Sequence, residues 1–98
     1  MIKDDEYLIV ERVPTVEEYK KLRKAVGWME IDDEAIEKGL RNSLFSICVL
    51  FNNKVIGCGR IVGDDGIYFY IQDVIVLPEF QRKGIGKRIM EAIIDYLK

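Results

Sequence analysis

The chain has 98 residues, 49% of them hydrophobic and 33% charged, with a net charge of −2, a composition typical of one soluble globular domain. The slight acidity argues against a nucleic-acid binder, and no apolar stretch reaches the about 18 residues of a membrane span. The N-terminus is too acidic for a secretory leader, so we expect a cytoplasmic protein without nucleic-acid or membrane partners. The chain has no histidine, which excludes Cys-His and Ser-His nucleophile pairs and imidazole metal ligands within it, and we expect no metal.

The first third of the chain predicts a strand followed by two helices. Residues 7–13 (YLIVERV) have the composition of a short strand. Thr15 and Glu18 have the spacing of a capping box and should open a helix that ends at Gly27. Asp32 should begin a second helix, whose acidic first turn suits the helix dipole.

The rest of the chain predicts three strands and a final helix. SICVLF and KVIGCGRIV flank residues 52–53 (NN) as a hairpin, and GDDG leads into the longest strand, at residues 68–77. From residue 85 to residue 97 an apolar residue recurs every four positions, which indicates an amphipathic helix. The predicted order is β-α-α-β-β-β-α, in one α/β domain over residues 1–98.

The two cysteines fall on the two strands of the predicted hairpin. A two-residue turn would pair Phe51 with Lys54 and Cys48 with Gly57, so that Cys48 and Cys58 point to opposite faces. A loop one residue longer would place them opposite each other. We expect two buried, reduced thiols rather than a disulfide.

The segment FQRKGIG, residues 80–86, lies between the longest strand and the last helix. The first backbone N–H groups of a helix have no intrahelical acceptor, and the helix dipole makes that end positive. Gly84 and Gly86 would let a ligand approach these N–H groups closely. Four cationic residues surround the same point: Arg82, Lys83, Lys87 and Arg88. The pattern predicts an anion site whose natural ligand is a polyphosphate.

Two common phosphate-binding motifs do not fit this segment. The dinucleotide fingerprint G-x-G-x-x-G would need glycine at position 89, where the chain has Ile89, and the P-loop sequence is absent. A structural loop without a ligand remains the alternative.

Residues 72–97, QDVIVLPEFQRKGIGKRIMEAIIDYL, resemble the coenzyme-A-binding motif of the GCN5-related N-acetyltransferase (GNAT) superfamily. Its signature, [Q/R]-x-x-G-x-[G/A], is matched by Gln81, Gly84 and Gly86. The order of elements also matches, so the resemblance covers essentially the whole chain. It implies a mixed, mostly antiparallel sheet with helices on both faces, and acetyl-CoA as acyl donor. Family members continue with a fifth strand, a helix and a closing hairpin, so we expect a domain incomplete at its C-terminus.

The resemblance also implies roles for residues of the site. Backbone groups of Val74, Ile75 and Val76 would bind the pantetheine arm, and the N–H of Val74 or Ile75 would stabilise the oxyanion. Gln81 would shape the entrance of the loop. The pyrophosphate would be held by backbone N–H groups of Arg82, Lys83, Gly84, Ile85, Gly86 and Lys87. The acceptor amine would attack the thioester directly, without an acetyl-enzyme.

The catalytic base and the acceptor pocket match less closely. Histone-modifying relatives have a glutamate at the position of Tyr70, and a tyrosine is a poor base at neutral pH. Asp73 is the nearest acid and the candidate base through water; a structural or substrate-orienting carboxylate is the alternative. Trp28 and Glu30 fall where relatives line the acceptor pocket, although plain core for Trp28 and solvated surface for Glu30 explain them equally well.

The sequence therefore predicts an N-acetyltransferase domain that acts on an amine of a small molecule or peptide. The alternative is a non-catalytic acyl-CoA-binding or assembly module. Nucleic-acid binding through the cationic run at residues 19–24 has less support, because that run fits a solvated helix face. The strand at residues 68–77 is apolar on both faces and would pair on one side only, which predicts a homo-oligomer formed through the open edge.

Overall fold

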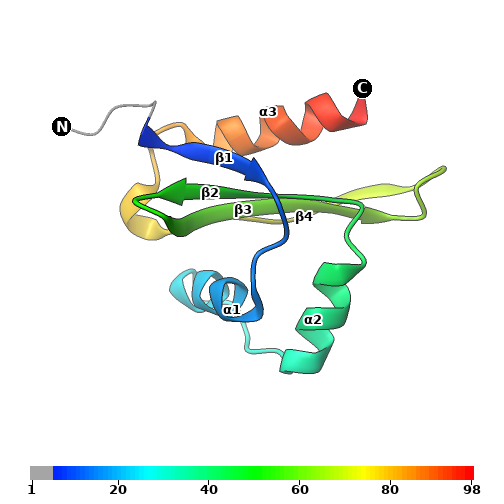
Figure 1. The fold of residues 1–98 in the computed structure, drawn as a ribbon, viewed down its shortest axis with the longest axis horizontal. Helices are drawn as coiled ribbons and strands as arrows, with labels where there is room; N and C mark the ends of the chain where they lie inside the picture. The colour runs from blue at the N-terminus through cyan, green and yellow to red at the C-terminus, as the bar shows by residue number, and fades with distance from the viewer. Residues whose placement is uncertain (1–5) are drawn as a thin grey trace.

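The computed structural model describes residues 6–98 and has the predicted order of elements. They are β1 (Leu8–Glu11), α1 (Val16–Ala25), α2 (Asp33–Arg41), β2 (Phe45–Phe51), β3 (Lys54–Gly63), β4 (Phe69–Val76), a 3-10 turn (Pro78–Phe80) and α3 (Ile85–Leu97). The strands form one sheet in the order β1-β2-β3-β4, and every pairing is antiparallel. α3 covers one face of the sheet, whereas α1 and α2 lie on the other (Figure 1). The predicted α/β class is confirmed.

The helices on the α1–α2 face begin at the residues that the sequence indicated. Thr15 accepts a hydrogen bond from the Glu18 backbone, and the Glu18 carboxylate accepts one from the Thr15 backbone, which completes the capping box. Asp32 caps α2 by accepting from the N–H groups of Glu34 and Ala35. None of the helices within residues 6–98 is long and apolar enough to cross a membrane.

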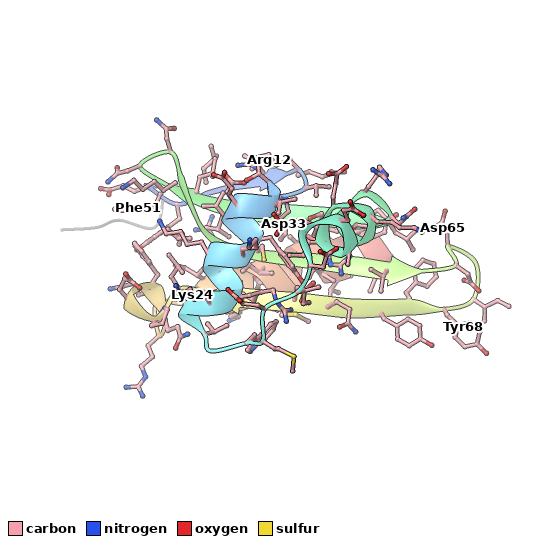
Figure 2. All side chains as sticks on the ribbon, turned by 90° about the horizontal axis from the view of Figure 1, so that it is seen from below. Arg12, Lys24, Asp33, Phe51, Asp65 and Tyr68 are labelled. Atoms are coloured by element: carbon pink, nitrogen blue, oxygen red, sulfur yellow. The ribbon has the colours of Figure 1, made fainter. Side chains whose placement is uncertain are left out.

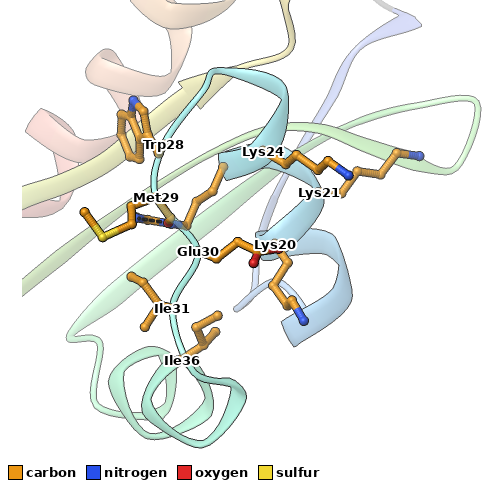
Figure 3. Close-up of a pocket in the computed structure, with 9 residues that line it drawn as sticks. Lys20, Lys21, Lys24, Trp28, Met29, Glu30, Ile31 and Ile36 are labelled. Atoms are coloured by element: carbon orange, nitrogen blue, oxygen red, sulfur yellow. Dashed lines mark hydrogen bonds between the residues drawn. The ribbon is translucent and has the colours of Figure 1, made fainter.

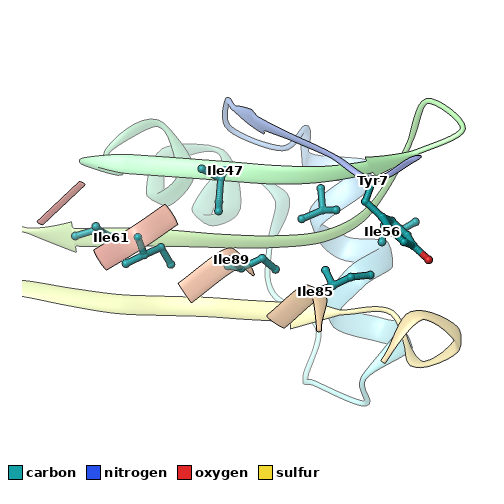
Figure 4. Packing of buried hydrophobic residues seen from close by; sticks show 8 residues of the cluster. Tyr7, Ile47, Ile56, Ile61, Ile85 and Ile89 are labelled. Atoms are coloured by element: carbon teal, nitrogen blue, oxygen red, sulfur yellow. The ribbon is translucent and has the colours of Figure 1, made fainter. Parts of the chain in front are cut away.

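α3 packs closely on the sheet because glycines of β3 have no side chain that would hold the helix away. Its buried residues Ile85 and Ile89 face the isoleucines of β2 and β3 (Figure 4). A Cβ atom added to Gly59 would lie 2.7 Å from the Ile89 Cγ2 atom, a distance that real contacts do not reach. The helix therefore rests directly on the backbone of β3, which fixes the position of its N-terminus relative to β4.

The strand register around the two cysteines differs from the expectation. The turn at residues 52–53 forms with positive φ angles of 52° and 62°, as a two-residue hairpin requires. A register shift after Val49, however, brings Cys48 opposite Cys58, where the expected register had Gly57. The thiols therefore share one face, and the prediction of opposite faces is wrong. Both are buried and free, and burial raises the pKa of Cys48 to about 11 and that of Cys58 to about 12.

Candidate coenzyme and acceptor site

The N-terminus of α3 lacks a side-chain cap. Its N-cap residue is Gly84, at φ +80°, and no acidic residue occupies its first turn. The first intrahelical bond runs from the Arg88 N–H to the Gly84 carbonyl, at 3.2 Å. The N–H groups of Ile85, Gly86 and Lys87 precede it and point out of the helix end. Since the Ile85 side chain is anchored in the core, this end is held in place as an anion-binding site would need.

The two glycines of the motif differ in whether the fold explains why glycine occupies the position. Gly84 has the left-handed backbone that glycine adopts at little cost, so the turn explains it. Gly86 lies within the helix without a positive φ, and a Cβ atom added there would meet nothing within 4 Å. Neither the backbone conformation nor the packing of residues 6–98 requires glycine at position 86. Close approach of a ligand is the role that the sequence motif predicts for Gly86.

Gln81 ties the loop to the end of β4. Its side-chain amide nitrogen donates a hydrogen bond to the Val76 carbonyl oxygen at 2.9 Å. The next loop residue, Arg82, has a positive φ of 66°, so the chain turns sharply between this anchor and Gly84. The structure thus brings Gln81, Gly84 and Gly86 together at one end of β4, with Arg82 and the adjacent Lys83 between them.

β4 is one of the two edge strands of the sheet, and its backbone has an open side next to this loop. The Leu77 N–H donates to the Ile56 carbonyl of β3 at 2.9 Å. Because backbone groups alternate along a regular antiparallel strand, those of Ile75 point to β3 and those of Val76 to the open side, where the Val76 carbonyl accepts the bond from Gln81. The register shift opposite Gly59 ends this alternation at Val74. Of the three residues predicted to bind pantetheine, Val76 is the one whose backbone groups this alternation places on the open edge.

Asp73 stands at an irregularity of β4. The register between β3 and β4 shifts opposite Gly59, and Asp73 has a positive φ of 56°. Its side chain is 10% exposed and points toward α1. One carboxylate oxygen accepts hydrogen bonds from Arg60 Nε at 2.7 Å and from the Tyr19 hydroxyl at 2.8 Å. The other oxygen lies 3.8 Å from Arg23 Nη1.

These contacts bear on the candidate base. Burial, followed by the hydrogen bond to Asp73, raises the pKa of Tyr19, so the phenol stays a donor. The hydrogen bonds from Tyr19 and Arg60 let the Asp73 carboxylate join β4 to α1 and β3, which is the structural alternative for this residue. The sequence analysis did not single out Tyr19, Arg23 or Arg60. The signal was an arginine and an aspartate, each alone in an apolar stretch of adjacent strands.

Trp28 and Glu30 line a cavity of about 290 Å³ between α1 and the loop that follows it (Figure 3). The cavity is lined by Lys20, Lys21, Arg23, Lys24, Trp28, Met29, Glu30, Ile31 and Ile36. Trp28 is 42% exposed, which does not fit a plain core residue. The Arg23 guanidinium lies 5.2 Å from the Trp28 ring centroid and donates to the Met29 carbonyl at 2.9 Å. Arg23 therefore connects this pocket to Asp73.

The chain belongs to the acetyltransferase (GNAT) family, whose model matches residues 11–98. Among curated proteins it is similar to an uncharacterized N-acetyltransferase ycf52-like from Prochlorococcus marinus, with 32% identity over 102 residues. That match covers 97% of this chain and 57% of the relative, so the chain spans little more than half of that protein.

Two solved structures share the fold. The first is a protein of unknown function from meticillin-resistant Staphylococcus aureus, SA2161, described as a probable acetyltransferase, with 38% identity and a TM-score of 0.88. The match covers 93% of this chain and 68% of that one. The second is an aminoglycoside acetyltransferase from an uncultured soil metagenomic sample, in complex with sisomicin, with 25% identity and a TM-score of 0.74. That match covers 95% of this chain and 70% of the other.

Proposed function

We propose that the chain binds acetyl-CoA at the junction of β4 and α3. The observation that carries the proposal is the uncapped N-terminus of α3, with a glycine at position 86 that the fold itself does not require. The pyrophosphate would lie on the N–H groups of residues 82–87, and the pantetheine arm would pair with the open edge at Val74 and Val76. Family membership supports acetyl-CoA as the ligand.

The proposed reaction is transfer of the acetyl group to an amine of a small molecule or peptide. The neutral amine attacks the thioester carbonyl, a C–N bond forms, and the C–S bond breaks. The released CoA thiolate takes up a proton, and the amine nitrogen loses one. The Val74 N–H, beside the irregularity of β4, would donate to the oxyanion. Asp73 stays a candidate base through water, and the cytoplasmic location also stays a prediction.

The second candidate is a non-catalytic acyl-CoA-binding or assembly module. It is favoured by the Asp73 side chain, which is 10% exposed and already accepts hydrogen bonds from Arg60 and Tyr19, so that the carboxylate has a structural role independent of catalysis. The two candidates differ in turnover, because both bind CoA and only one consumes the thioester.

We expect slow acetyl transfer, because the candidate base Asp73 is largely buried and hydrogen-bonded within the fold, and a reaction without a well-placed general base lacks a contribution of about 10²–10⁴-fold. Release of free thiol from acetyl-CoA, followed with a thiol reagent across a panel of small amines and peptides, should show an amine-dependent rate below about 1 s⁻¹. The rate should vanish in Gly86→Val. Intact CoA binding without amine-dependent release across the panel would identify the non-catalytic module instead.

We also propose that the open edge of β4 mediates self-association. Five consecutive residues at this end of the sheet are apolar or aromatic and exposed: Ile67, Tyr68, Phe69, Tyr70 and Ile71. Tyr68 lies at the end of the sheet, away from α1 and α2 (Figure 2). An exposed apolar edge is a template for pairing with a second copy. CoA bound along Val74 and Val76 would block part of this edge.

Light scattering behind gel filtration tests this at about 100 μM chain, a concentration at which association with a dissociation constant as weak as about 10 μM is visible. We expect a mass above the 11.4 kDa of the monomer, and a decrease toward it with CoA. Tyr70→Lys, which places a charge on the edge, should favour the monomer. Ile94→Lys, an equally apolar and exposed position on α3, is the matched control. A monomer in wild type without CoA would refute the proposal.

A further inference from the structure

The polar cluster at Asp73 has more positive than negative charge. It contains two guanidinium groups, Arg23 and Arg60, against one carboxylate. The three side chains are only 15%, 17% and 10% exposed, respectively. Removing a charged group from water is costly unless an opposite charge compensates it. An anion bound beside the second guanidinium group would therefore be stabilising.

Arg23, rather than Arg60, is the cation without a close carboxylate partner. Arg60 donates to the Asp73 carboxylate at 2.7 Å, and its Nη1 also donates to the Gly39 carbonyl and the Ser43 hydroxyl. Arg23, in contrast, has a 3.8 Å ion pair with Asp73. Its Nη1 makes a long bond of 3.4 Å to the Tyr19 hydroxyl, and its Nη2 donates to a neutral acceptor, the Met29 carbonyl, at 2.9 Å. Its Nε is buried without an acceptor among residues 6–98. Arg23 is thus the cation with incomplete compensation.

Arg23 also forms part of the wall of the pocket, where its guanidinium stacks beside Trp28. The rest of the pocket near Trp28 is apolar, with Met29, Ile31 and Ile36. Figure 3 shows Trp28 and Met29 along the loop that leaves α1, with Ile31 and Ile36 beyond them. A ligand that has an apolar part and one negatively charged group would fit this combination of an aromatic ring, aliphatic walls and a guanidinium.

The other charged residues of the pocket add to the positive potential. Glu30 is the one acidic residue among the nine that line it, and it lies beside Lys20, which pairs with Asp33 at 2.8 Å. Lys21 and Lys24 extend from α1 away from Trp28, so they act over distance and not by contact. Such an effect reaches about 10 Å at moderate salt.

We propose that this pocket selects an acyl acceptor that carries a carboxylate beside an apolar group, such as an amino acid or an acidic peptide. The inference rests on the proposed acetyl transfer, since it names the class of amine that the same site accepts. Arg23 would hold the carboxylate, and Trp28 would contact the apolar part. Arg23 contacts Asp73, the residue before Val74, so a ligand on Arg23 lies next to the strand that would hold the thioester. A polycationic acceptor such as an aminoglycoside would meet like charge here.

Trp28 provides the measurement, because it is the only tryptophan in the sequence. Two probes share a 2-phenylethyl group and carry opposite charges: 3-phenylpropionate and 3-phenylpropylamine. We expect 3-phenylpropionate to change the Trp28 emission with a dissociation constant about tenfold below that of the amine. The difference should shrink as salt approaches about 1 M, where the screening length falls to about 3 Å.

Two variants test whether Arg23 causes the preference for the anionic probe. Arg23→Gln should reduce the ratio of the two dissociation constants to within about twofold, because it removes the charge but keeps a polar side chain of similar reach. Arg41→Gln, at an exposed arginine of α2 that pairs with Glu37, should leave the ratio as in wild type. The wild-type comparison of the probes decides the charge class even if Arg23→Gln does not fold.

Equal or tighter binding of the amine to the wild-type chain, absence of a saturable response to either probe, or a preference that survives in Arg23→Gln would each overturn the inference. CoA titrated into the same samples reports on the proposed function separately. If CoA binds and the charge preference is missing, only the acceptor class is wrong. If CoA does not bind, the proposed function fails whatever the probes show.

Discussion

Asp73→Asn should lower the free energy of unfolding by about 3 kcal/mol, because removing one member of a buried ion pair leaves its partners without a counter-charge. Here the partners are Arg60, which loses a 2.7 Å hydrogen-bonded pair, and Arg23. Asparagine tolerates the positive φ at this position as well as aspartate does, so the change isolates the charge from the backbone. Urea denaturation followed by circular dichroism measures the loss.

Asp65→Asn is the matched control. Asp65 has a similar positive φ of 62° but is exposed, at the turn between β3 and β4. Its substitution should change the free energy of unfolding by less than about 0.5 kcal/mol. Equal stability of the two variants would show that the cluster of Asp73, Arg60 and Arg23 does not support the fold.

The features that the sequence predicted are those set by neighbouring residues. The capping box at Thr15 and Glu18 closes within four residues, and the turn at residues 52–53 requires only that two asparagines accept positive φ. α3 follows from apolar residues at helical spacing. The loop at Gly84 and Gly86 could be found because an uncapped helix start beside a strand is itself a local pattern.

The features that the sequence did not predict depend on how strands pair. The register shift after Val49 is set by contacts across the sheet, and it reversed the expected facing of Cys48. The cluster around Asp73 likewise joins residues separated by up to 54 positions in the chain. Gly59 gave no local signal either, since its reason is the approach of Ile89 from another element.

Gly86→Val should abolish CoA binding without loss of stability. The added side chain would project beside the N–H groups that the pyrophosphate is proposed to contact, and a β-branched group there would hold the ligand away. Within the protein, a Cβ atom at this position meets nothing within 4 Å, so the fold has room for it. Replacing a helical glycine even tends to stabilise the helix, by a few tenths to about 1 kcal/mol.

Gly39→Val is the matched control, because Gly39 is also a helical glycine whose added Cβ atom would meet nothing within 4 Å. It lies in α2, on the face of the sheet opposite α3. Both variants change helix propensity in the same way, and only one of them lies at the proposed pyrophosphate site.

The most direct measurement is calorimetric titration of CoA into the wild-type chain, Gly86→Val and Gly39→Val. We expect wild type and Gly39→Val to bind with the same affinity and Gly86→Val to bind at least about 100-fold more weakly. Equal CoA affinity in all three chains would contradict the assignment of the N-terminus of α3 as the coenzyme site.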